Sequence, residues 1–381
     1  MSMKARLGDY IQEYSVRNRA EEDIPVYSVT NTQGFCQDYF GKEVASKDKS
    51  TYKIVPQGCF AYNPSRINVG SVDWQRYEDR VIVSPLYNVF SVAPQLDQQY
   101  LYYYLKSDFA LQRIRAVATG SVRDNLKLAM LYEFPINLPS MEGQKEIVKK
   151  LDGLKRVISL REQELQTLDD LIKARFVEMF GDPDVNPMCW QEKSLSEMID
   201  VFGGYAFKSD GFNETDGIPV LRIGNINAGF FKPLNMVYWE EDENLERYIM
   251  YPGDLVMSLT GTVGKDDYGN VCILGEEYSK YYLNQRNAKL ELKKGLDKYY
   301  LCQILRFEKI KKRLTGISRG VRQANISNRD ILELKIPVPS FELQEQYAAF
   351  VAQVDKSKVA VQKALDEAQL LFDSLMQKYF G

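Results

Sequence analysis

The chain repeats itself once, at a separation of about 200 residues. Phe380-Gly381 repeats Phe180-Gly181, and the same offset holds backward for tens of residues. The N-terminal parts match more loosely, with Ile218–Val220 corresponding to Ile24–Val26. This period is far longer than the roughly 20–50 residues of a solenoid repeat, and each copy is long enough to be a domain with its own core. The repeat therefore predicts two similar domains that can present two similar surfaces to one partner.

Composition indicates a soluble globular protein. The chain has 381 residues, of which 45% are apolar and 27% are charged, which is ordinary for such proteins. No apolar run approaches the roughly 18–20 residues that a membrane span requires, and the N-terminus does not resemble a secretory signal. The five cysteines are scattered without zinc or redox spacing. We therefore expect a cytoplasmic protein that does not contact a membrane.

The chain contains no histidine. Imidazole metal sites, histidine acid–base catalysis and every Ser-His or Cys-His relay are therefore excluded, whereas carboxylate chemistry remains open. The formal net charge is −3, so any affinity for nucleic acid depends on where the charges lie rather than on their sum. The 25 tyrosines suit an interface, because tyrosine covers a large area with few rotamers.

Each copy begins with a region of short β-type runs separated by Gly, Pro, Asn and Asp, followed by a helical stretch. The runs are Ile24–Thr30, Lys53–Tyr62 and Arg80–Val83 in the first copy, and Pro219–Ile223, Asp254–Leu259 and Ala288–Leu292 in the second. The helical stretches are Gln98–Ala118 and Leu296–Thr315. We interpret each region as a compact α+β domain.

Each copy ends in a long stretch whose apolar residues recur alternately every four and three residues, which is the signature of a coiled coil. The first stretch places Ile147, Leu151, Leu154, Ile158, Leu165, Leu168 and Ile172 on this seam, and the second places Val351, Val354, Val361, Leu365 and Phe372 there. Ser140 and Ser340 precede the two stretches as N-cap candidates.

A helix of about 38 residues is about 57 Å long, too long to pack against a domain whose radius of gyration is about 14 Å. The two apolar stripes therefore need a partner, and the nearest candidate is each other. Two units related by a pseudo-twofold axis would pair the helices antiparallel. The alternative left open is that each helix docks on its own domain.

Three strings imitate catalytic motifs without completing them. Gly261–Lys265 lacks the first glycine of a phosphate-binding loop and predicts a turn. Asn63–Arg66 is similar to the tetrapeptide of amino-methyltransferases, but it lacks the second proline and the aromatic residue. Asp266 or Asp267 with Glu291–Lys293 imitates a nuclease set, although the alternating residues of Lys289–Lys293 more simply indicate a half-buried strand. We predict no catalytic residue and no metal site.

Positive charge is concentrated at equivalent places in the two copies. A basic segment between Arg306 and Arg322 corresponds to one between Lys106 and Lys127. Two such segments in an acidic chain favour two phosphate-binding faces, and arginine or asparagine can also read base edges. The candidates are Arg113, Arg115, Arg123, Asn125, Lys312, Arg313, Arg319, Arg322 and Asn325. For any single residue, a solvated helix face remains the alternative.

These features together resemble the specificity subunit of type I restriction–modification systems. The resemblance covers essentially the whole chain. Its most specific parts are the P-S-x-E-x-Q strings at Pro139–Gln144 and Pro339–Gln344, and the string "YNPSR" within Phe60–Val72. The string at Gly204–Phe212 is weaker.

The resemblance implies an α+β fold of two similar target-recognition domains, separated by two long helices that form an antiparallel coiled coil. The implied boundaries are 1–141 and 182–340 for the recognition domains and 142–181 and 341–381 for the helices. Each domain would read one half of a split site in double-stranded DNA, and the helices would fix the length of the unread spacer. Asn63 and Arg66 join the predicted DNA contacts.

The resemblance also implies partners. Two modification (methyltransferase) subunits would dock on this chain, and restriction (motor-endonuclease) subunits would join for cleavage. S-adenosylmethionine, ATP and magnesium are expected on those partners, with no cofactor on this chain and no catalysis by it. Two rival functions stay open: a DNA-modifying enzyme with an unrecognised carboxylate site, which would turn over alone, and a coiled-coil interaction protein that does not bind DNA.

Overall fold

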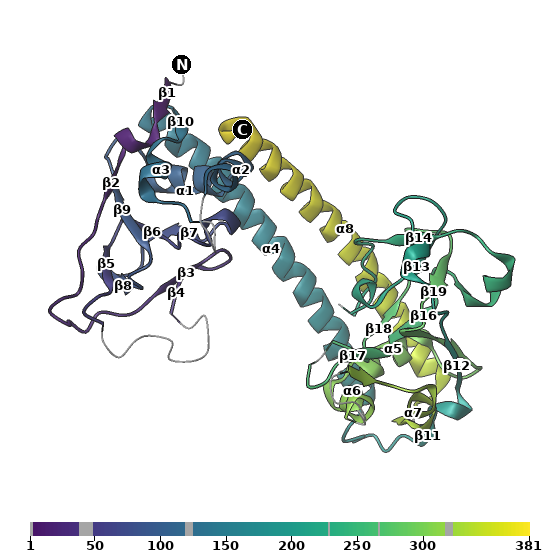
Figure 1. The fold of residues 1–381 in the computed structure, drawn as a ribbon. Coiled ribbons are helices and arrows are strands. Elements are labelled where there is room, and N and C mark those ends of the chain that lie inside the picture. Colours follow the sequence, from purple (N-terminus) through teal and green to yellow (C-terminus); the bar gives the residue numbers. More distant parts are fainter. Residues whose placement is uncertain (1–2, 38–48, 119–124, 228, 266, 317–322) are drawn as a thin grey trace. The chain divides into compact units, whose positions relative to one another are not determined.

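The computed structural model describes residues 3–37, 49–118, 125–227, 229–265, 267–316 and 323–381 (Figure 1). Packing divides the chain into two compact units. Unit 1 comprises residues 1–163 and 362–381, and unit 2 comprises residues 164–361. The division runs through two 40-residue helices, α4 (Met141–Phe180) and α8 (Phe341–Phe380), so each unit contains half of each helix. The implied domain boundaries, which set the helices apart, remain a prediction.

Unit 1 is built around one antiparallel sheet with helices on one face. The sheet has the order β2 (Ile11–Glu13), β9 (Asn88–Val92), β6 (Phe60–Tyr62), β7 (Val72–Trp74). Its smaller pairs are β1 (Met3–Arg6) with β10 (Pro135–Leu138), β3 (Ser28–Thr30) with β4 (Gly34–Cys36), and β5 (Lys53–Pro56) with β8 (Arg80–Val83). Side chains such as Phe60 and Phe90 pack against helices α1 (Gln98–Lys106), α2 (Asp108–Val117) and α3 (Leu128–Tyr132). The alternate residues Ala61 and Val89 pack against β5 and β8, as the two-residue period of a strand requires.

Unit 2 repeats this plan. Its main sheet has the order β12 (Ile199–Gly203), β20 (Asn287–Leu292), β16 (Leu255–Ser258), β18 (Val271–Ile273). The helices beside it are α5 (Lys298–Arg306), α6 (Glu308–Thr315) and α7 (Asn328–Glu333). A second sheet contains β14 (Val237–Trp239), β13 (Ile218–Leu221), β19 (Tyr281–Leu283) and β15 (Ile249–Met250), and two pairs join β11 (Glu192–Ser194) with β22 (Lys335–Pro337) and β17 (Thr260–Thr262) with β21 (Gln323–Asn325). The predicted α+β class and the duplicated plan are confirmed.

The predicted boundaries of several short elements were wrong. The stretch Gln98–Ala118 is two helices, because Ser107 takes an extended backbone with ψ 152° and its hydroxyl accepts a hydrogen bond from the Ala110 N–H. Phe307 breaks the stretch Leu296–Thr315 with ψ 128°. The run Lys53–Tyr62 is likewise two strands, separated by a turn at Gly58 whose φ of 82° favours glycine.

The run Ile24–Thr30 contains a strand only over its last three residues, Ser28–Thr30. Val26 makes a single parallel bridge to Ile82. A strand needs a continuous ladder of backbone hydrogen bonds. The part of this run before Ser28 has only the isolated bridge to β8, so it does not form a strand.

The long helices pack against each other inside unit 2, and they do so antiparallel. The Lys358 ammonium lies 2.6 Å from the Asp169 carboxylate, while the Tyr347 hydroxyl donates to the Ile172 carbonyl at 3.4 Å. The Phe176 ring centre is 5.5 Å from that of Tyr347. Partner numbers fall along α8 as they rise along α4, which is the order of antiparallel helices.

In unit 1 the first half of α4 and the last half of α8 contribute to one core with α1. Leu151 is fully buried there beside Phe372, and the Phe380 ring centre lies 5.1 Å from that of Tyr100. All twelve residues predicted for the seam are buried or half-buried: Ile147, Leu151, Leu154, Ile158, Leu165, Leu168, Ile172, Val351, Val354, Val361, Leu365 and Phe372. Because α4 and α8 pack against each other, the alternative of two helices docked independently on their own domains is wrong.

The P-S-x-E-x-Q strings have a structural explanation. Gln144 is fully buried at the start of α4, where its side-chain oxygen accepts from the Asp97 N–H at 2.8 Å and its amide donates to the Pro139 and Gln95 carbonyls. Gln344 makes the same contacts with Asp297, Pro339 and Gly295. The predicted N-cap is confirmed at Ser140, whose hydroxyl accepts from the Gly143 N–H. Each glutamine thus ties the start of a long helix to the N-cap of a shorter helix, α1 or α5.

In the part of the chain that the structure describes, no helix is both long enough and apolar enough to span a bilayer.

Candidate nucleic-acid interface

The loop of residues 63–70 joins β6 to β7 in unit 1 and begins with a tight turn. The Asn63 side-chain oxygen accepts hydrogen bonds from the Ser65 N–H at 3.1 Å and from the Ser65 hydroxyl at 2.9 Å. Asparagine commonly stabilises turns in this way. Arg66 follows with its side chain exposed, and Gly70 closes the loop with φ 87°. Asn63 therefore shapes the loop, and Arg66 is presented by it.

Two further segments lie against the loop 63–70. The Arg115 Nε in α2 donates to the Asn68 carbonyl at 3.2 Å, and the Leu126 N–H donates to the Pro64 carbonyl at 3.1 Å. Because Arg115 and Asn125 are also exposed, the structure gathers Asn63, Arg66, Arg115 and Asn125 at one face of unit 1.

Arg113 lies apart from this group. Residues two apart on a helix point about 200° from each other, so Arg113 and Arg115 cannot serve the same face of α2. The Arg113 guanidinium carbon is 5.4 Å from the centre of the Phe134 ring. Arg123 falls outside the described residues.

The counterpart in unit 2 is the longer loop between β16 and β18, which contains β17. Asn325 in β21 lies opposite Thr260, whose hydroxyl donates to the Asn325 side-chain oxygen at 3.2 Å. The Ile326 N–H donates to the Leu259 carbonyl, just as Leu126 donates to Pro64 in unit 1. The string Gly261–Lys265 is a turn, closed by a 3.0 Å bond from the Lys265 N–H to the Thr262 carbonyl, as the sequence predicted.

The predicted cations of α6 have acidic partners. The Arg313 guanidinium and the Lys309 ammonium lie 3.0 and 2.9 Å from the Asp184 carboxylate, and together they hold the pKa of Asp184 below its usual value. Lys312 pairs with Glu308 one turn away. Arg319 and Arg322 fall outside the described residues. Because exposed ion pairs are weak, a phosphate can compete with these carboxylates, and the DNA contacts of Lys312, Arg313 and Asn325 remain predictions.

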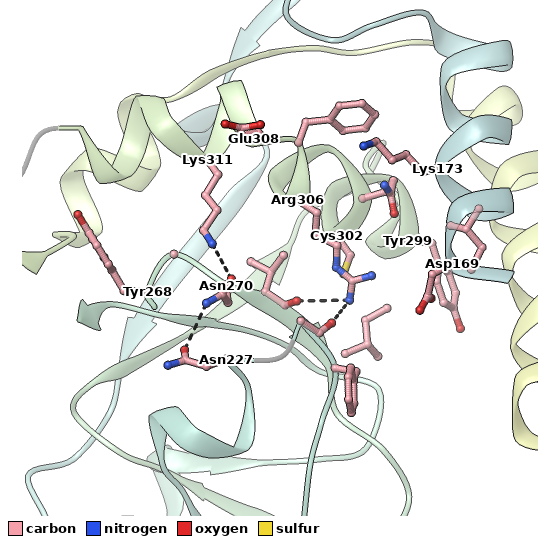
Figure 2. A pocket seen from close by; sticks show the side chains of 18 of the residues that line it. Asp169, Lys173, Asn227, Tyr268, Asn270, Tyr299, Cys302, Arg306, Glu308 and Lys311 are labelled. Carbon is pink, nitrogen blue, oxygen red and sulfur yellow. Dashed lines mark hydrogen bonds between the residues drawn. The ribbon is translucent and has the colours of Figure 1, made fainter. Parts of the chain in front are cut away.

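Unit 2 also contains an open cleft of about 1220 Å³ beside α5 and α6 (Figure 2). The Lys311 ammonium on α6 donates to the Asn270 side-chain oxygen at 2.6 Å, and the Asn270 amide donates in turn to Asn227 at 3.4 Å. Arg306 enters the cleft from the end of α5 and bonds two backbone carbonyls (Figure 2). Polar contacts therefore connect both helices to the loop around residue 229.

Unit 1 has bulkier side chains at the corresponding positions. Tyr102 and Lys155 stand where unit 2 has Cys302 and Asp355, and Trp74 ends β7 as Ile273 ends β18. The Lys155 ammonium lies 5.3 Å from the Tyr102 ring centre, and the Arg76 guanidinium lies 4.4 Å from the ring of Trp74. The repeated plan thus carries different side chains in its two copies.

The nuclease-like residues are paired for structural reasons. Lys289 bridges to Asp254 and Lys293 to Asp200, each at 2.9 Å, from a strand, β20, whose Ala288 and Leu290 are buried. This confirms the half-buried strand. Within the described ranges, no group of three or more Cys, Asp or Glu side chains could hold a metal ion. Asp266 lies outside these ranges.

Two residues of the basic segments were not assigned a role from sequence, namely Lys106 and Arg306. Each is the last residue of a helix, α1 or α5, and each donates to two backbone carbonyls in segments far apart in the sequence. The one signal in the sequence was a cation at the same place in both copies, because carbonyl acceptors belong to the backbone and leave no trace in residue type.

Comparison with known proteins identifies relatives of the whole chain. A family model described as the type I restriction modification DNA specificity domain matches residues 8–170 and again residues 187–368. The type I restriction enzyme MjaVIII specificity subunit of Methanocaldococcus jannaschii is 27% identical over 299 residues, covering 71% of this chain and 68% of the relative. A putative type I specificity subunit of Haemophilus influenzae is 23% identical over 95% of this chain and 87% of its own length. The crystal structure of a type I restriction–modification S subunit from M. genitalium shares the fold, with a TM-score of 0.56 and 15% identity over 100% of this chain and 96% of that one.

Proposed function

Since this chain belongs to the type I restriction modification DNA specificity domain family, we propose that it is the subunit that reads DNA sequence in a type I restriction–modification complex. Unit 1 reads one half of a split site in double-stranded DNA and unit 2 reads the other. The chain also assembles the complex by binding the partner subunits.

The observation that carries this proposal is the double match of the family model, once to each copy of the repeat. Each copy contributes an α+β unit with a comparable loop, helix and basic segment. In unit 1, exposed Arg66 and Arg115 lie around one loop, an arrangement suited to phosphate and base contacts. The different side chains at equivalent positions support two different half-sites.

The partners are two modification subunits and, for cleavage, restriction subunits in the cytoplasm. S-adenosylmethionine is bound by the former, and ATP and magnesium by the latter, while this chain has no catalytic role. Support for docking comes from large apolar side chains on α4 and α8 that lie off the helix seam and are exposed: Val157, Leu160, Leu171, Val359, Leu370 and Leu371. They offer apolar area that a protein partner can cover.

Reconstitution with a modification subunit tests the proposal. The modification subunit should methylate DNA only when this chain and S-adenosylmethionine are present, and the complex should bind one duplex sequence in preference to others with strong salt dependence. The chain alone should neither methylate nor cleave DNA. Methylation of the same sequences without this chain, or turnover by the chain alone, would overturn the proposed role.

A further inference from the structure

In both units, a cation at the end of one helix bridges an early loop to the backbone at or just before the start of a sheet strand, β7 or β18. Lys106 ends α1 and Arg306 ends α5, one repeat of 200 residues apart in the sequence. Lys106 donates to the Gly70 carbonyl just before β7 and Arg306 to the Val271 carbonyl in β18, and each also donates to a carbonyl in a loop much earlier in the chain. The accepting carbonyls are not at equivalent positions, but in both units the helix-ending cation ties an early loop to the same strand of the main sheet.

In unit 1 the early loop is the tip of the β3–β4 hairpin, residues 31–33. The Lys106 ammonium donates to the Asn31 carbonyl at 3.1 Å and also to the Gly70 carbonyl. Gly70 ends the loop 63–70, against which Arg115 is bound. The hairpin tip is therefore tied directly to the face that holds Arg66 and Arg115.

The hairpin tip is held stiffly while its side chains stay exposed. Asn31, Thr32 and Gln33 are exposed, but the Gln33 N–H donates to the Thr30 hydroxyl at 3.0 Å. Behind the tip, the buried Asp73 carboxylate accepts from the Phe35 N–H at 3.2 Å. Gly34 has φ 65°, and a Cβ there would lie 2.0 Å from the Asp73 carboxylate, so this position requires glycine.

In unit 2 the early loop comprises residues 227 and 229–231. Arg306 donates to the Gly229 carbonyl and, at 3.4 Å, to the Val271 carbonyl (Figure 2). Buried Asn225 closes the base of the loop by donating to the Lys232 and Leu234 carbonyls at 3.0 Å. Phe230 at the tip is 56% exposed. Gly229 before Phe230 has a positive φ of 77°, as Gly34 has at the hairpin tip.

We propose that these two early loops are additional DNA-reading elements, and that Lys106 and Arg306 are the positioning residues that hold them at the DNA face. The inference deepens the proposed function and rests on it. Asn31, Thr32 and Gln33 offer amide and hydroxyl groups, of which glutamine and asparagine amides pair with adenine edges in the major groove. Phe230 offers an apolar ring that contacts a thymine methyl or stacks at a base step. The ligand of both loops is a base edge of duplex DNA.

The test compares single-base selectivity of the reconstituted complex for its own site. Binding is measured by competition with duplexes in which each base pair of the site is changed in turn. Gln33→Ala and Lys106→Met should each lose about tenfold or more of the discrimination at the same few positions of one half-site. Phe230→Ala and Arg306→Met should do so in the other half. Affinity for unrelated DNA should change little, since it depends on phosphate contacts.

Conservative and remote variants separate positioning from general damage. Lys106→Arg and Arg306→Lys keep the cation and should restore the selectivity, and Lys363→Met on α8, whose side chain is 78% exposed, should have no effect. If Lys106→Met proves poorly folded by thermal unfolding, the exposed Gln33→Ala carries the test. This inference alone is overturned if the wild-type complex is selective but Gln33→Ala and Phe230→Ala leave the base profiles unchanged. It is also overturned if each variant loses selectivity equally in both halves. A wild-type complex without any sequence preference overturns the proposed function as well.

Discussion

Lys106 is a lysine whose charge depends on pH near neutrality. Burial lowers its pKa to about 8, opposed by the carboxylate of Asp73 and reinforced by the ammonium of Lys155. Tyr102 on its own helix lies 5.5 Å away, and Arg76 shares the Asp73 carboxylate at 2.6 Å. The corresponding residue in unit 2 is Arg306, and arginine as a residue type stays charged in proteins. The two clamps are therefore expected to respond differently to pH.

Selectivity for the half-site of unit 1 should fall as pH rises from 7 to 9. An ammonium donates stronger hydrogen bonds to carbonyls than a neutral amine does, so deprotonation of Lys106 loosens the hairpin tip. The Lys106→Arg variant should show no such fall, and neither should the other half-site. Single-base competition at several pH values measures this, and a parallel fall in both half-sites would contradict it.

The expected fall in selectivity cannot result from unfolding caused by the titration of Lys106. The pKa of Lys106 is lower in the folded chain than its ordinary 10.5, so between about pH 8 and 10.5 the unfolded state binds more protons at this group. By linkage, its contribution to the free energy of unfolding therefore increases with pH over that window. With rising pH, selectivity for this half-site should fall while the contribution of Lys106 to stability rises.

Arg115→Ala should weaken binding by unit 1 alone. Its exposed guanidinium lies at the predicted face, and Nε also supports the loop 63–70 through the Asn68 carbonyl. Loss of one phosphate contact should reduce the slope of log affinity against log salt by about one. Salt titrations of the wild type, Arg115→Ala and the control Arg329→Ala, an 84% exposed cation on α7, measure this. An identical slope for wild type and Arg115→Ala would remove Arg115 from the DNA contacts.

At the scale of elements, the buried glutamines at the helix starts should be important for stability. Gln144→Leu or Gln344→Leu leaves an N–H and two carbonyls without their partner, and each unsatisfied buried group costs about 1–3 kcal/mol. Each variant should therefore lose at least about 2 kcal/mol of unfolding free energy, measured with denaturant. Gln346→Leu, an exposed position two residues along α8, should stay within about 0.5 kcal/mol of the wild type.

The long elements could be predicted from sequence and the short ones only in part. The 3.5-residue spacing identified α4 and α8, because few structures besides a coiled coil sustain such a stripe over about five heptads. The breaks at Ser107 and Phe307 were missed since the apolar pattern continues through them. Among the candidate contacts, the loop 63–70 was recognised by its string, but Lys106 joins it to the hairpin through the backbone carbonyls of Gly70 and Asn31. Such contacts between distant segments leave no pattern in the residue types.

At the scale of the whole molecule, duplication explains both what the two units share and what they do not. Helices α1 and α5, the buried glutamines and the cationic clamps recur one repeat apart. Trp74, Tyr102 and Lys155 are replaced by Ile273, Cys302 and Asp355. Shared positions serve the architecture, and the varied ones lie around the faces that we assign to DNA.

Lengthening both long helices by one heptad should lengthen the unread spacer of the DNA site. Seven residues inserted after Gln163 in α4 and after Val361 in α8, where the compact units divide, preserve the seam and add about 10.5 Å. That length corresponds to about three base pairs of roughly 3.4 Å. Methylation-site mapping of the variant should show the same bases in both halves with a longer gap. An unchanged gap would refute the role of the helices in setting the spacer.

The central claim is that this one chain carries two separate DNA readers, and a map of the bases methylated by the reconstituted complex tests it most directly. We predict two short specified blocks separated by a gap of fixed length and free sequence. We also predict that Gln33→Ala relaxes one block and Phe230→Ala relaxes the other. A single continuous motif, or the same map when this chain is replaced by an unrelated specificity subunit, would contradict the claim.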